Sequence, residues 1–485
     1  MKIDTSTFGE LANKWEEKYP VDLWMIEGIH IWPVLKRIIY FTIFRDSKNN
    51  HLEPGKFKLE NVGRNIKKKL RFFHAYYHLF FLDLKKTNFL FSGGSSYRVN
   101  WEEKRFNRFF DPMLDYIESK GEVSYLLEYN KIDIKTVYKS QRVIDLIDFL
   151  PFFNSNKKIE GEYNLLEDLK DFNLFLNEVE DKTGVESHFL KSNLLKQINT
   201  IINWANLFSF FIKKADAKYT IGLCYYSNAM YGMNFASNKL GIKSIDMQHG
   251  LQGYLHPAYH FKKVPSSGYN ILPKDFWVWE TSSFQNINNW THNSVHKAIL
   301  GGNPWIDYFQ SNKGLNDIRN EEFPMILFTL QLGKSILPDY FLDVIKATCK
   351  NYNWWFRYHP RTSQKEKEEI ELKLNSLRLL DRVNIKDANN LPLPVLLNNC
   401  QLNISKNSGS IAEAAMMQRH SLIIDELGIR SYKDLIDRGL AEGCLSKNSK
   451  EIVIRINSIL NNKKFNLNEQ LEEFTYKTIL DTYIQ

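Results

Sequence analysis

The sequence predicts an α/β protein built from two doubly wound domains. Two observations lead to this fold class: short apolar segments alternate with helical patterns along most of the chain, and the alternation falls into two series. The polar segment 310–323, QSNKGLNDIRNEEF, separates the two series and has the composition of an interdomain linker. A length of 485 residues is sufficient for two or three domains.

These patterns give a division of the chain into four segments. Residues 1–309 are expected to form an N-terminal domain with a helical extension at its start, and 310–323 the linker. Residues 324–446 are expected to form a C-terminal domain, followed by helices over 447–485.

The first series contains six predicted strands and an intervening segment, 135–215, that is expected to be mostly helical. The predicted strands are 87–91, 123–128, 219–225, 243–247, 276–280 and 298–302. The first of them runs into the loop 92–96, SGGSS, whose glycines let a ligand approach the backbone closely. A complete GxGxxG pattern is missing, so this loop is interpreted as lining a cleft and not as a dinucleotide site.

The second series ends in its most informative stretch, 402–425, with the sequence LNISKNSGSIAEAAMMQRHSLIID. It predicts a strand over 402–405, a Ser/Gly loop, a helix over 411–417 and another strand over 421–425, and a short helix over 393–399 is predicted before it. Ser410 is the expected N-cap, and Glu413 stands at the spacing of a capping box. A loop of this kind at a helix N-terminus suits an anion, although an ordinary βα turn with a good cap is the alternative.

Composition excludes some classes of function. The net charge of +8, from 64 basic and 56 acidic residues, suits a small anionic ligand or a peripheral contact with an anionic membrane. No zinc-finger, RNP or arginine-rich pattern indicates a nucleic-acid partner. The polar N-terminus is not a signal peptide and no apolar run reaches a membrane span, so the protein is expected to be cytoplasmic.

The segment 64–86, RNIKKKLRFFHAYYHLFFLDLKK, is basic, aromatic and predicted to be helical. The favoured interpretation is a core helix with solvated ends. The alternative is a helix that lies in a membrane interface.

Polar groups follow the predicted strands of the second series and are the candidates for a nucleotide site. An arginine there can bind a phosphate with two hydrogen bonds, the Ser/Gly loop can bind its other oxygens, and a glutamate one turn into the helix can accept from ribose hydroxyls. A histidine can donate to the phosphate or the leaving oxygen, although a structural turn histidine and a capping glutamate are the alternatives. The candidates are Gln331, Gly333, His359, Arg361, Lys406, Ser408, Gly409, Ser410 and Glu413.

His249 is the outstanding candidate in the first series, because it follows a predicted strand and precedes a glycine. An imidazole there could act as general base on an acceptor hydroxyl or donate a hydrogen bond to the donor sugar. A buried turn histidine is the alternative. Asp246, Glu280 and Asp111 are further candidates for a catalytic carboxylate.

Four short motifs, in order along the chain, resemble those of bacterial GT-B glycosyltransferases of capsule and lipopolysaccharide synthesis. They are Gln248-His249-Gly250, Gly302-Asn303-Pro304, His359-Pro360-Arg361, and Ser408-Gly409-Ser410 with Glu413-Ala414-Ala415. The resemblance implies a GT-B-like fold, with two Rossmann-like domains facing a cleft. The His-Pro and Ser-x-Ser motifs are similar to those of Kdo- and sialyl-type transferases, in which they bind the phosphate and base of a CMP-sugar.

The resemblance also extends to capsule polysaccharide biosynthesis proteins and, more distantly, to glycerophosphotransferases of teichoic-acid synthesis. An acidic Asp/Glu-Asp/Glu-Gly motif, which supplies the base in one sialyltransferase group, is not evident. The identity of the base, and whether the enzyme inverts or retains, therefore stay open.

The expected function is transfer of a CMP-activated Kdo- or nonulosonic-type sugar to a surface polysaccharide. The nucleotide sugar is a substrate, neither metal nor cofactor is expected, and the acceptor is a glycan or a lipid-linked glycan. The expected location is the cytoplasm, with a peripheral contact to the inner membrane. Alternatives are a sugar-nucleotide 2-epimerase, a glycerophosphotransferase, and a non-catalytic scaffold of a polysaccharide-assembly complex.

Overall fold

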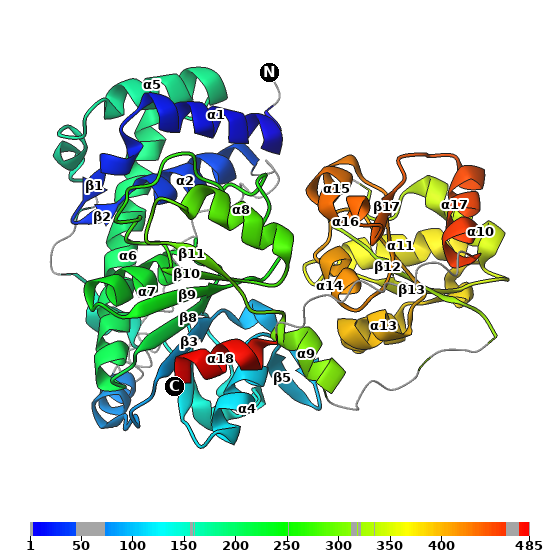
Figure 1. Ribbon diagram of the computed structural model, residues 1–485, viewed down its shortest axis with the longest axis horizontal. Coiled ribbons are helices and arrows are strands. Elements are labelled where there is room, and N and C mark those ends of the chain that lie inside the picture. Colours follow the sequence, from blue (N-terminus) through cyan, green and yellow to red (C-terminus); the bar gives the residue numbers. More distant parts are fainter. Residues whose placement is uncertain are drawn as a thin grey trace, which may run out of the picture. The chain divides into compact units, whose positions relative to one another are not determined.

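A computed structural model describes most of the chain, which divides into two compact units (Figure 1). The described residues are 3–44, 73–155, 159, 161–250, 252–311, 318, 322–333, 335–461 and 475–484. Unit 1 comprises Met1–Arg98, Lys104–Gly301 and Lys477–Gln485, and unit 2 comprises Val99–Glu103 and Gly302–Tyr476. Most of the proposed linker 310–323 and the first part of the segment 64–86 lie outside the described residues.

Unit 1 is built on a seven-stranded sheet in the order β11-β10-β9-β8-β3-β6-β7, in which every pair is parallel. Its strands are short and most of their residues are buried, as expected of parallel strands covered on both faces. Their bounds are β3 (Phe89–Gly93), β6 (Ser124–Glu128), β7 (Val143–Asp145), β8 (Tyr219–Leu223), β9 (Lys243–Met247), β10 (Asp275–Val278) and β11 (Lys297–Leu300). Two small hairpins, β1 (Met25–Ile26) with β2 (Ile29–His30) and β4 (Arg98–Trp101) with β5 (Lys104–Asn107), lie outside this sheet.

The helices of unit 1 include a long central one, α6, which packs against α7 and α2. A buried glutamate, Glu16, ties the N-terminal extension to the rest of the unit. It accepts hydrogen bonds from Trp32 Nε1 and Lys36 Nζ, both at 2.9 Å, and from the backbone N–H of Lys263 at 2.9 Å. The helices are α1 (Thr5–Lys18), α2 (Trp32–Phe44), α4 (Asp111–Ser119), α5 (Phe172–Thr183), α6 (Ser187–Lys214), α7 (Asn228–Lys239), α8 (Thr281–Thr291) and α18 (Tyr476–Ile484).

Unit 2 is built on a six-stranded parallel sheet in the order β14-β13-β12-β15-β16-β17. Along β12, Ile326 and Phe328 face the apolar cluster that contains Phe341 of α10, while Leu327 faces a second cluster with Leu396 of α13. The strands are β12 (Met325–Thr329), β13 (Asn353–Arg357), β14 (Val383–Asn384), β15 (Leu402–Ser405), β16 (Ser421–Ile423) and β17 (Ala441–Gly443). The helices are α9 (Pro304–Ser311), α10 (Asp339–Thr348), α11 (Gln364–Ser376), α12 (Lys386–Asn390), α13 (Leu393–Asn399), α14 (Ser410–Met416), α15 (Glu426–Ser431), α16 (Lys433–Asp437) and α17 (Ser449–Asn461). The predicted fold class, two doubly wound α/β domains, is confirmed.

The boundaries of the units differ from the expected domain boundaries at two places. Helix α9, placed by the sequence in the first domain, groups with unit 2 because Ile306 packs into the cluster of Leu396 and Leu397. Most of α18 groups with unit 1, where Tyr483 Oη donates a hydrogen bond to Asp275 Oδ2 at 3.0 Å. The segment 135–215 also differs, since its first part contains β7 and short 3₁₀ turns before α5 and α6 begin.

The core-helix interpretation of 64–86 is wrong for its described part. Residues 73–81 form a helix with five large aromatic side chains exposed to solvent. Only small or aliphatic residues of this helix, Ala75 and Leu79, are buried against the unit. None of the helices in the described part of the chain is long and apolar enough to span a membrane.

Candidate functional site

The carboxyl edge of the unit 2 sheet has a topological switch point between β12 and β15. The chain leaves β12 for β13 on one side of it and later adds β15 on the other. In open α/β sheets, ligands bind outside the carboxyl ends of the strands at such a point. The loops that follow these three strands carry most of the residues that the sequence predicted for nucleotide binding.

The loop 406–410 after β15 is held over the switch point by its neighbours. Gln331 Nε2, from the loop after β12, donates a hydrogen bond to the carbonyl of Asn407 at 2.9 Å. The Lys406 ammonium donates to the carbonyl of Ser335, in that same loop. Tyr432 Oη donates to the carbonyl of Ser408 at 2.8 Å. The structure therefore brings the predicted Gln331 and the predicted loop 406–410 together.

Two further features of these loops bear on ligand binding. Gly333 has a φ of +140°, a backbone conformation that essentially only glycine adopts, so the chain can turn there without a side chain. Burial lowers the pKa of Lys406, which means that its charge lacks full solvation. An anion bound beside this ammonium would compensate for the missing solvation.

The predicted capping box of Ser410 and Glu413 is wrong. Ser410 is the first residue of α14, Gly409 takes the N-cap position, and the Ser410 hydroxyl is hydrogen-bonded to Thr329 Oγ1 at 2.8 Å. Because the Ser410 hydroxyl bonds to Thr329, a buried residue of β12, it does not cap the helix. Glu413 is only 5% exposed, which favours a structural role in holding α14 in place over a contact with ribose. The ribose contact stays a prediction.

His359 and Arg361 lie in the loop after β13, next to the end of β12. The backbone N–H of Arg361 donates to His359 Nδ1 at 3.1 Å. A neutral imidazole that accepts at Nδ1 carries its proton on Nε2, so His359 is arranged as a donor. The Arg361 side chain is exposed. The two predicted residues thus supply one hydrogen-bond donor and one cation at this edge.

Gly428, which the sequence analysis did not identify, supports the loop 406–410 from behind. A Cβ at this position would stand 1.9 Å from the Lys406 carbonyl oxygen and 2.8 Å from Ile423 Cγ2. We expect Gly428→Ala to displace this loop and to lower the stability of unit 2 by about 1–3 kcal/mol. Chemical denaturation measures the loss. Gly9→Ala, at a position with open space, is the control and should cost nothing; equal stability of the two variants would contradict the argument.

Unit 1 has its own switch point, between β3 and β8. β3 ends at Gly93, and the loop begins with Gly94. A Cβ on Gly94 would stand 2.5 Å from Asn130 Oδ1, so this loop is packed and not open at that residue. Cys224 follows β8 with a φ of +63°, a strained conformation for a side chain of its kind. Burial raises the pKa of the Cys224 thiol to about 12, so this thiol stays protonated.

His249 lies just beyond the end of β9, beside this switch point. Its Nε2 is 3.4 Å from Tyr226 Oη, and the Tyr97 ring meets its ring edge-on with centroids 5.5 Å apart. Burial, with a smaller contribution from the charge of Arg108, lowers the pKa of His249 to about 4. The imidazole is therefore neutral at physiological pH, which is the protonation state in which a general base acts.

Gln248 and Glu280 fix the chain on either side of His249. Gln248 Nε2 donates to both carboxylate oxygens of Glu280, at 3.2 and 3.1 Å, and to the carbonyl of Gly250 at 3.0 Å. Gln248 Oε1 accepts from the backbone N–H of Trp279 at 2.6 Å. Glu280 thus holds the Gln-His-Gly turn, which favours a positioning role for this predicted catalytic carboxylate.

Asp246 is buried under the same edge. Its Oδ1 accepts from the backbone N–H of Tyr225 at 3.0 Å, and its Oδ2 from Tyr259 Oη at 2.9 Å. Burial raises the pKa of Asp246 to about 8. With both oxygens occupied, this carboxyl group orders the loops after β8 and β9, and its catalytic role stays a prediction. Asp111 is likewise buried, in an ion pair with Arg98.

The sequence analysis missed three side chains that surround His249, namely Tyr97, Tyr226 and His256. The ring centroids of Tyr226 and His256 are 5.3 Å apart, and burial lowers the pKa of His256 to about 3. The only sequence signal was their position: Tyr97 follows the Gly-Gly loop and Tyr226 follows β8. Together with His249 they form a cluster of aromatic and imidazole rings.

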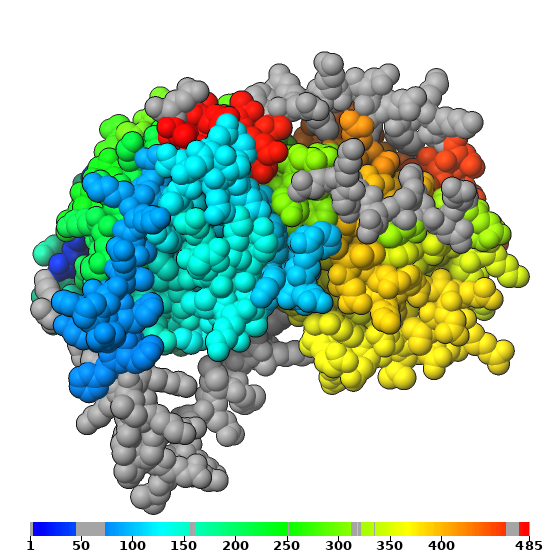
Figure 2. All heavy atoms as spheres, turned by 90° about the horizontal axis from the view of Figure 1, so that it is seen from below, coloured from blue at the N-terminus to red at the C-terminus, as the bar shows by residue number. Residues whose placement is uncertain are grey.

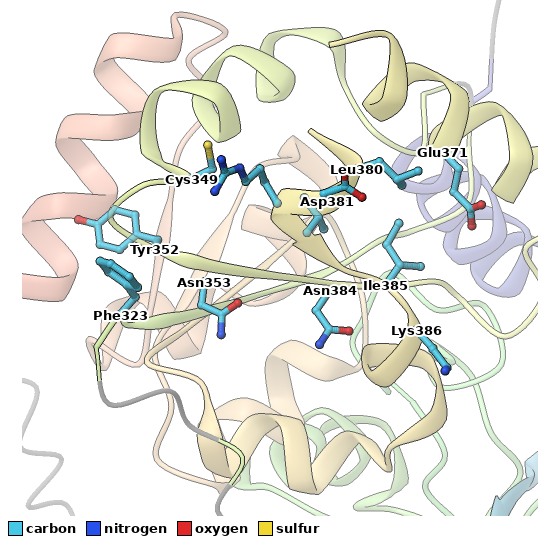
Figure 3. Close-up of a pocket in the computed structure, with 12 residues that line it drawn as sticks. Phe323, Cys349, Tyr352, Asn353, Glu371, Leu380, Asp381, Asn384, Ile385 and Lys386 are labelled. Carbon is cyan, nitrogen blue, oxygen red and sulfur yellow. The ribbon is translucent and has the colours of Figure 1, made fainter. Parts of the chain in front are cut away.

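A cavity of about 710 Å³ lies at the opposite, amino-terminal edge of the unit 2 sheet (Figure 3). Phe323 and Tyr352 line one end of it, and Glu371 and Lys386 the other. Tyr352 Oη already donates to Asn457 Oδ1 at 2.6 Å. Ligands of doubly wound sheets bind at the other edge, and the charges here are of both signs, so volume alone does not make this cavity the stronger candidate.

No known protein family and no curated protein matches this sequence. Solved structures do match the fold. A protein assigned as a UDP-N-acetylglucosamine 2-epimerase from Listeria monocytogenes aligns with a TM-score of 0.50 and 11% identity, over 82% of this chain and 95% of that one. The glycosyltransferase SnogD from Streptomyces nogalater aligns with a TM-score of 0.45 and 9% identity, over 82% of this chain and 99% of that one.

The two doubly wound units and the likeness to the Listeria protein place the chain among proteins of the GT-B type of fold. This confirms the expected fold class. At 11% identity the likeness concerns the fold alone.

Proposed function

We propose that this protein is a glycosyltransferase that acts on a nucleotide sugar, with the nucleotide bound by unit 2. The observation that carries the proposal is the convergence of loops after β12, β13 and β15 at one edge of the sheet. Gln331 and Lys406 lock two of these loops to each other, and the third presents His359 and Arg361. A fixed frame with several donors and two cations fits a diphosphate or phosphodiester.

The chemistry of the donor follows from these groups. The Arg361 guanidinium can bind phosphate oxygens with two parallel hydrogen bonds, and the partly desolvated Lys406 adds charge. His359 Nε2 can donate to the oxygen that leaves with the nucleotide. Positive charge and hydrogen-bond donors in fixed positions lower the energy of the leaving phosphate.

Unit 1 is the proposed site of the acceptor. His249, neutral at physiological pH, would take the proton of the attacking hydroxyl, while Tyr97 and Tyr226 present ring faces and a phenol to the acceptor sugar. Gln248 and Glu280 hold the turn that carries His249. The charge of Arg108 lowers the pKa of His249. The same cation could bind an anionic group on the donor sugar or on the acceptor sugar.

For the substrates, the motif resemblance supports a CMP-activated Kdo- or nonulosonic-type sugar as donor and a surface polysaccharide as acceptor. The acceptor would be a glycan or a lipid-linked glycan. Nothing in the described loops selects one nucleobase, so the base is best settled by direct binding measurements.

We expect Arg361→Ala to weaken nucleotide binding by roughly 10- to 100-fold, since hydrogen bonds to charged groups contribute about 1.5–3 kcal/mol. Calorimetric titration with CMP, CDP, UDP and GDP measures the affinity and identifies the base. Ser408→Ala should weaken binding less. Arg382→Ala, in the lining of the cavity at the amino-terminal edge of the sheet, is the matched control and should have no effect. A loss of affinity in Arg382→Ala alone would move the nucleotide site to that cavity.

An epimerase is the second candidate, favoured by the likeness to the Listeria protein assigned as a UDP-N-acetylglucosamine 2-epimerase. NMR of UDP-N-acetylglucosamine incubated with the protein alone separates the two functions. Inversion at the sugar C2 without any acceptor would indicate the epimerase. An unchanged UDP-N-acetylglucosamine, together with a CMP-sugar that is consumed only when a glycan acceptor is added, would indicate the transferase. A glycerophosphotransferase would act on a CDP-linked glycerol donor, and a scaffold would bind no nucleotide.

A further inference from the structure

The helix over 73–81 in unit 1 exposes a group of aromatic side chains with no covering element among the described residues. Their exposed fractions lie between 56% and 71%; they are Phe73, Tyr76, Tyr77, Phe80 and Phe81. On the opposite face, Ala75 is 5% exposed and Leu79 9%, and both belong to the apolar cluster that includes Phe211 of α6. The helix therefore packs against the unit with the face that carries Ala75 and Leu79, and its aromatic face is exposed to solvent.

The spacing of the five aromatic residues makes this face continuous. At about 100° per residue, positions 73, 76, 77, 80 and 81 fall within one arc of about 140°. His74 and His78 lie together at one edge of this arc, with their rings stacked at a centroid distance of 6.5 Å. An apolar arc of this width is the kind that a surface helix normally buries. Here it faces outward.

The aromatic surface continues onto neighbouring elements. The Tyr76 ring lies against Phe152 with centroids 5.6 Å apart, and the next residue, Phe153, lies 5.3 Å from Phe210 of α6. Lys214 Nζ lies 5.7 Å from the centroid of the Phe210 ring. Figure 2 shows part of this segment, in blue, at the surface of unit 1.

The sequence on either side of this helix carries mostly positive charge, with Asp83 as an exposed acid after it. The nine residues before the helix, 64–72, contain five cations and no acid: Arg64, Lys67, Lys68, Lys69 and Arg71. Lys85 follows the helix over 73–81, and Lys213 lies in the last turn of α6. Both side chains are exposed. Aromatic side chains together with lysine and arginine are the composition that binds the interface of an anionic bilayer.

We propose that the aromatic face of the helix over 73–81 docks onto the surface of an anionic lipid bilayer, without spanning it. The rings enter the boundary between head groups and acyl chains, while the neighbouring cations stay with the anionic head groups. Phe and Tyr are suited to this depth because they combine apolar area with a polar edge or hydroxyl. This inference concerns attachment and does not depend on the proposed function.

Vesicle flotation tests the proposal, with phosphatidylcholine vesicles with and without phosphatidylglycerol. We expect the full chain to float with the anionic vesicles at least 10-fold more than with the neutral ones, and added salt to reduce this binding. The triple variant Phe73→Ser, Tyr77→Ser, Phe80→Ser should lose at least 10-fold of the partitioning at an unchanged melting temperature.

The matched control replaces three exposed aliphatic residues on other helices, Leu174→Ser, Leu372→Ser and Ile454→Ser, which are 62%, 67% and 68% exposed. It should bind anionic vesicles as the unmodified chain does. The proposal is overturned if the unmodified chain ignores anionic vesicles, or if both triple variants lose binding equally. Light scattering that shows a dimer, dissociated only by the Phe73/Tyr77/Phe80 variant, would also overturn it, because a second copy would then be the occupant.

Discussion

Replacing His249 with alanine should lower kcat by roughly 10²–10⁴-fold, the range that a positioned acid–base group contributes. The affinity for the nucleotide should stay the same, because the proposed nucleotide residues belong to unit 2 and His249 to unit 1. Turnover of the donor identified by calorimetry, together with a titration of the variant, measures both quantities. His188→Ala, at an exposed position of α6, should match the unmodified protein.

The pH dependence of the rate gives an independent check on His249. A general base acts in its deprotonated form, and burial lowers the pKa of His249 to about 4. The acidic limb of kcat/KM should therefore fall at a pH well below 6.5, the ordinary value for histidine. A limb near 6.5 would point to a more solvated histidine than this one.

Two results would contradict the role given to His249. Near-normal turnover of His249→Ala would make it a turn residue and would leave Glu280 or Asp246 as the candidate base. A loss of nucleotide affinity in proportion to activity would place His249 in the donor site.

The second large effect should come from a buried ion cluster in unit 1. Arg98 Nε donates to Glu128 Oε1 at 2.6 Å, and Arg98 Nη1 lies 3.4 Å from Asp111 Oδ2, with all three side chains at most 1% exposed. Arg98→Met would leave two buried carboxylates without their cation. We expect the free energy of unfolding to drop by about 3–5 kcal/mol.

The loss in Arg98→Met should depend on pH. Burial already raises the pKa of Asp111 to about 7 with the arginine present, and it also raises the pKa of Glu128. Removal of the cation raises both pKa values further, so the folded state binds more protons than the unfolded state and its stability falls as pH rises. Urea unfolding should therefore show a larger loss at pH 8 than at pH 5.

A surface arginine provides the control for the ion cluster. Arg142 pairs with Glu118, with side chains 20% and 41% exposed, and Arg142→Met should cost at most about 1 kcal/mol. If Arg98→Met is no more costly than Arg142→Met, the cluster contributes nothing specific to stability.

Some elements of this fold were predictable to the residue. The strands β9 (Lys243–Met247) and β15 (Leu402–Ser405) and the helix α13 (Leu393–Asn399) have the predicted bounds. Both strands alternate apolar with polar residues, with Ile245 and Met247 in the first and Leu402 and Ile404 in the second, and the helix follows a proline. These local signals do not depend on which neighbour packs against them.

Other features depended on neighbours that one sequence does not reveal. The Ser410 hydroxyl bonds to Thr329, 81 residues away in the chain, and this contact overrides its suitability as an N-cap. Tyr97 and Tyr226 carry no spacing signal in a chain with 14% aromatic residues. The helix within 64–86 was likewise predicted, but the favoured interpretation buried its aromatic side chains, and five of them are exposed.

The return of α18 to unit 1 has a consequence for the order in which the protein acquires its structure. Leu480 is fully buried, and Tyr483 and Asp481 are hydrogen-bonded to Asp275 and Tyr116 of that unit. Asp275 and Tyr116 are synthesised some 200 or more residues before their partners in α18. During translation, the surface of unit 1 that binds α18 therefore stays uncovered until unit 2 has been synthesised. A premature stop codon before residue 477 would therefore damage the part of the protein that is translated first.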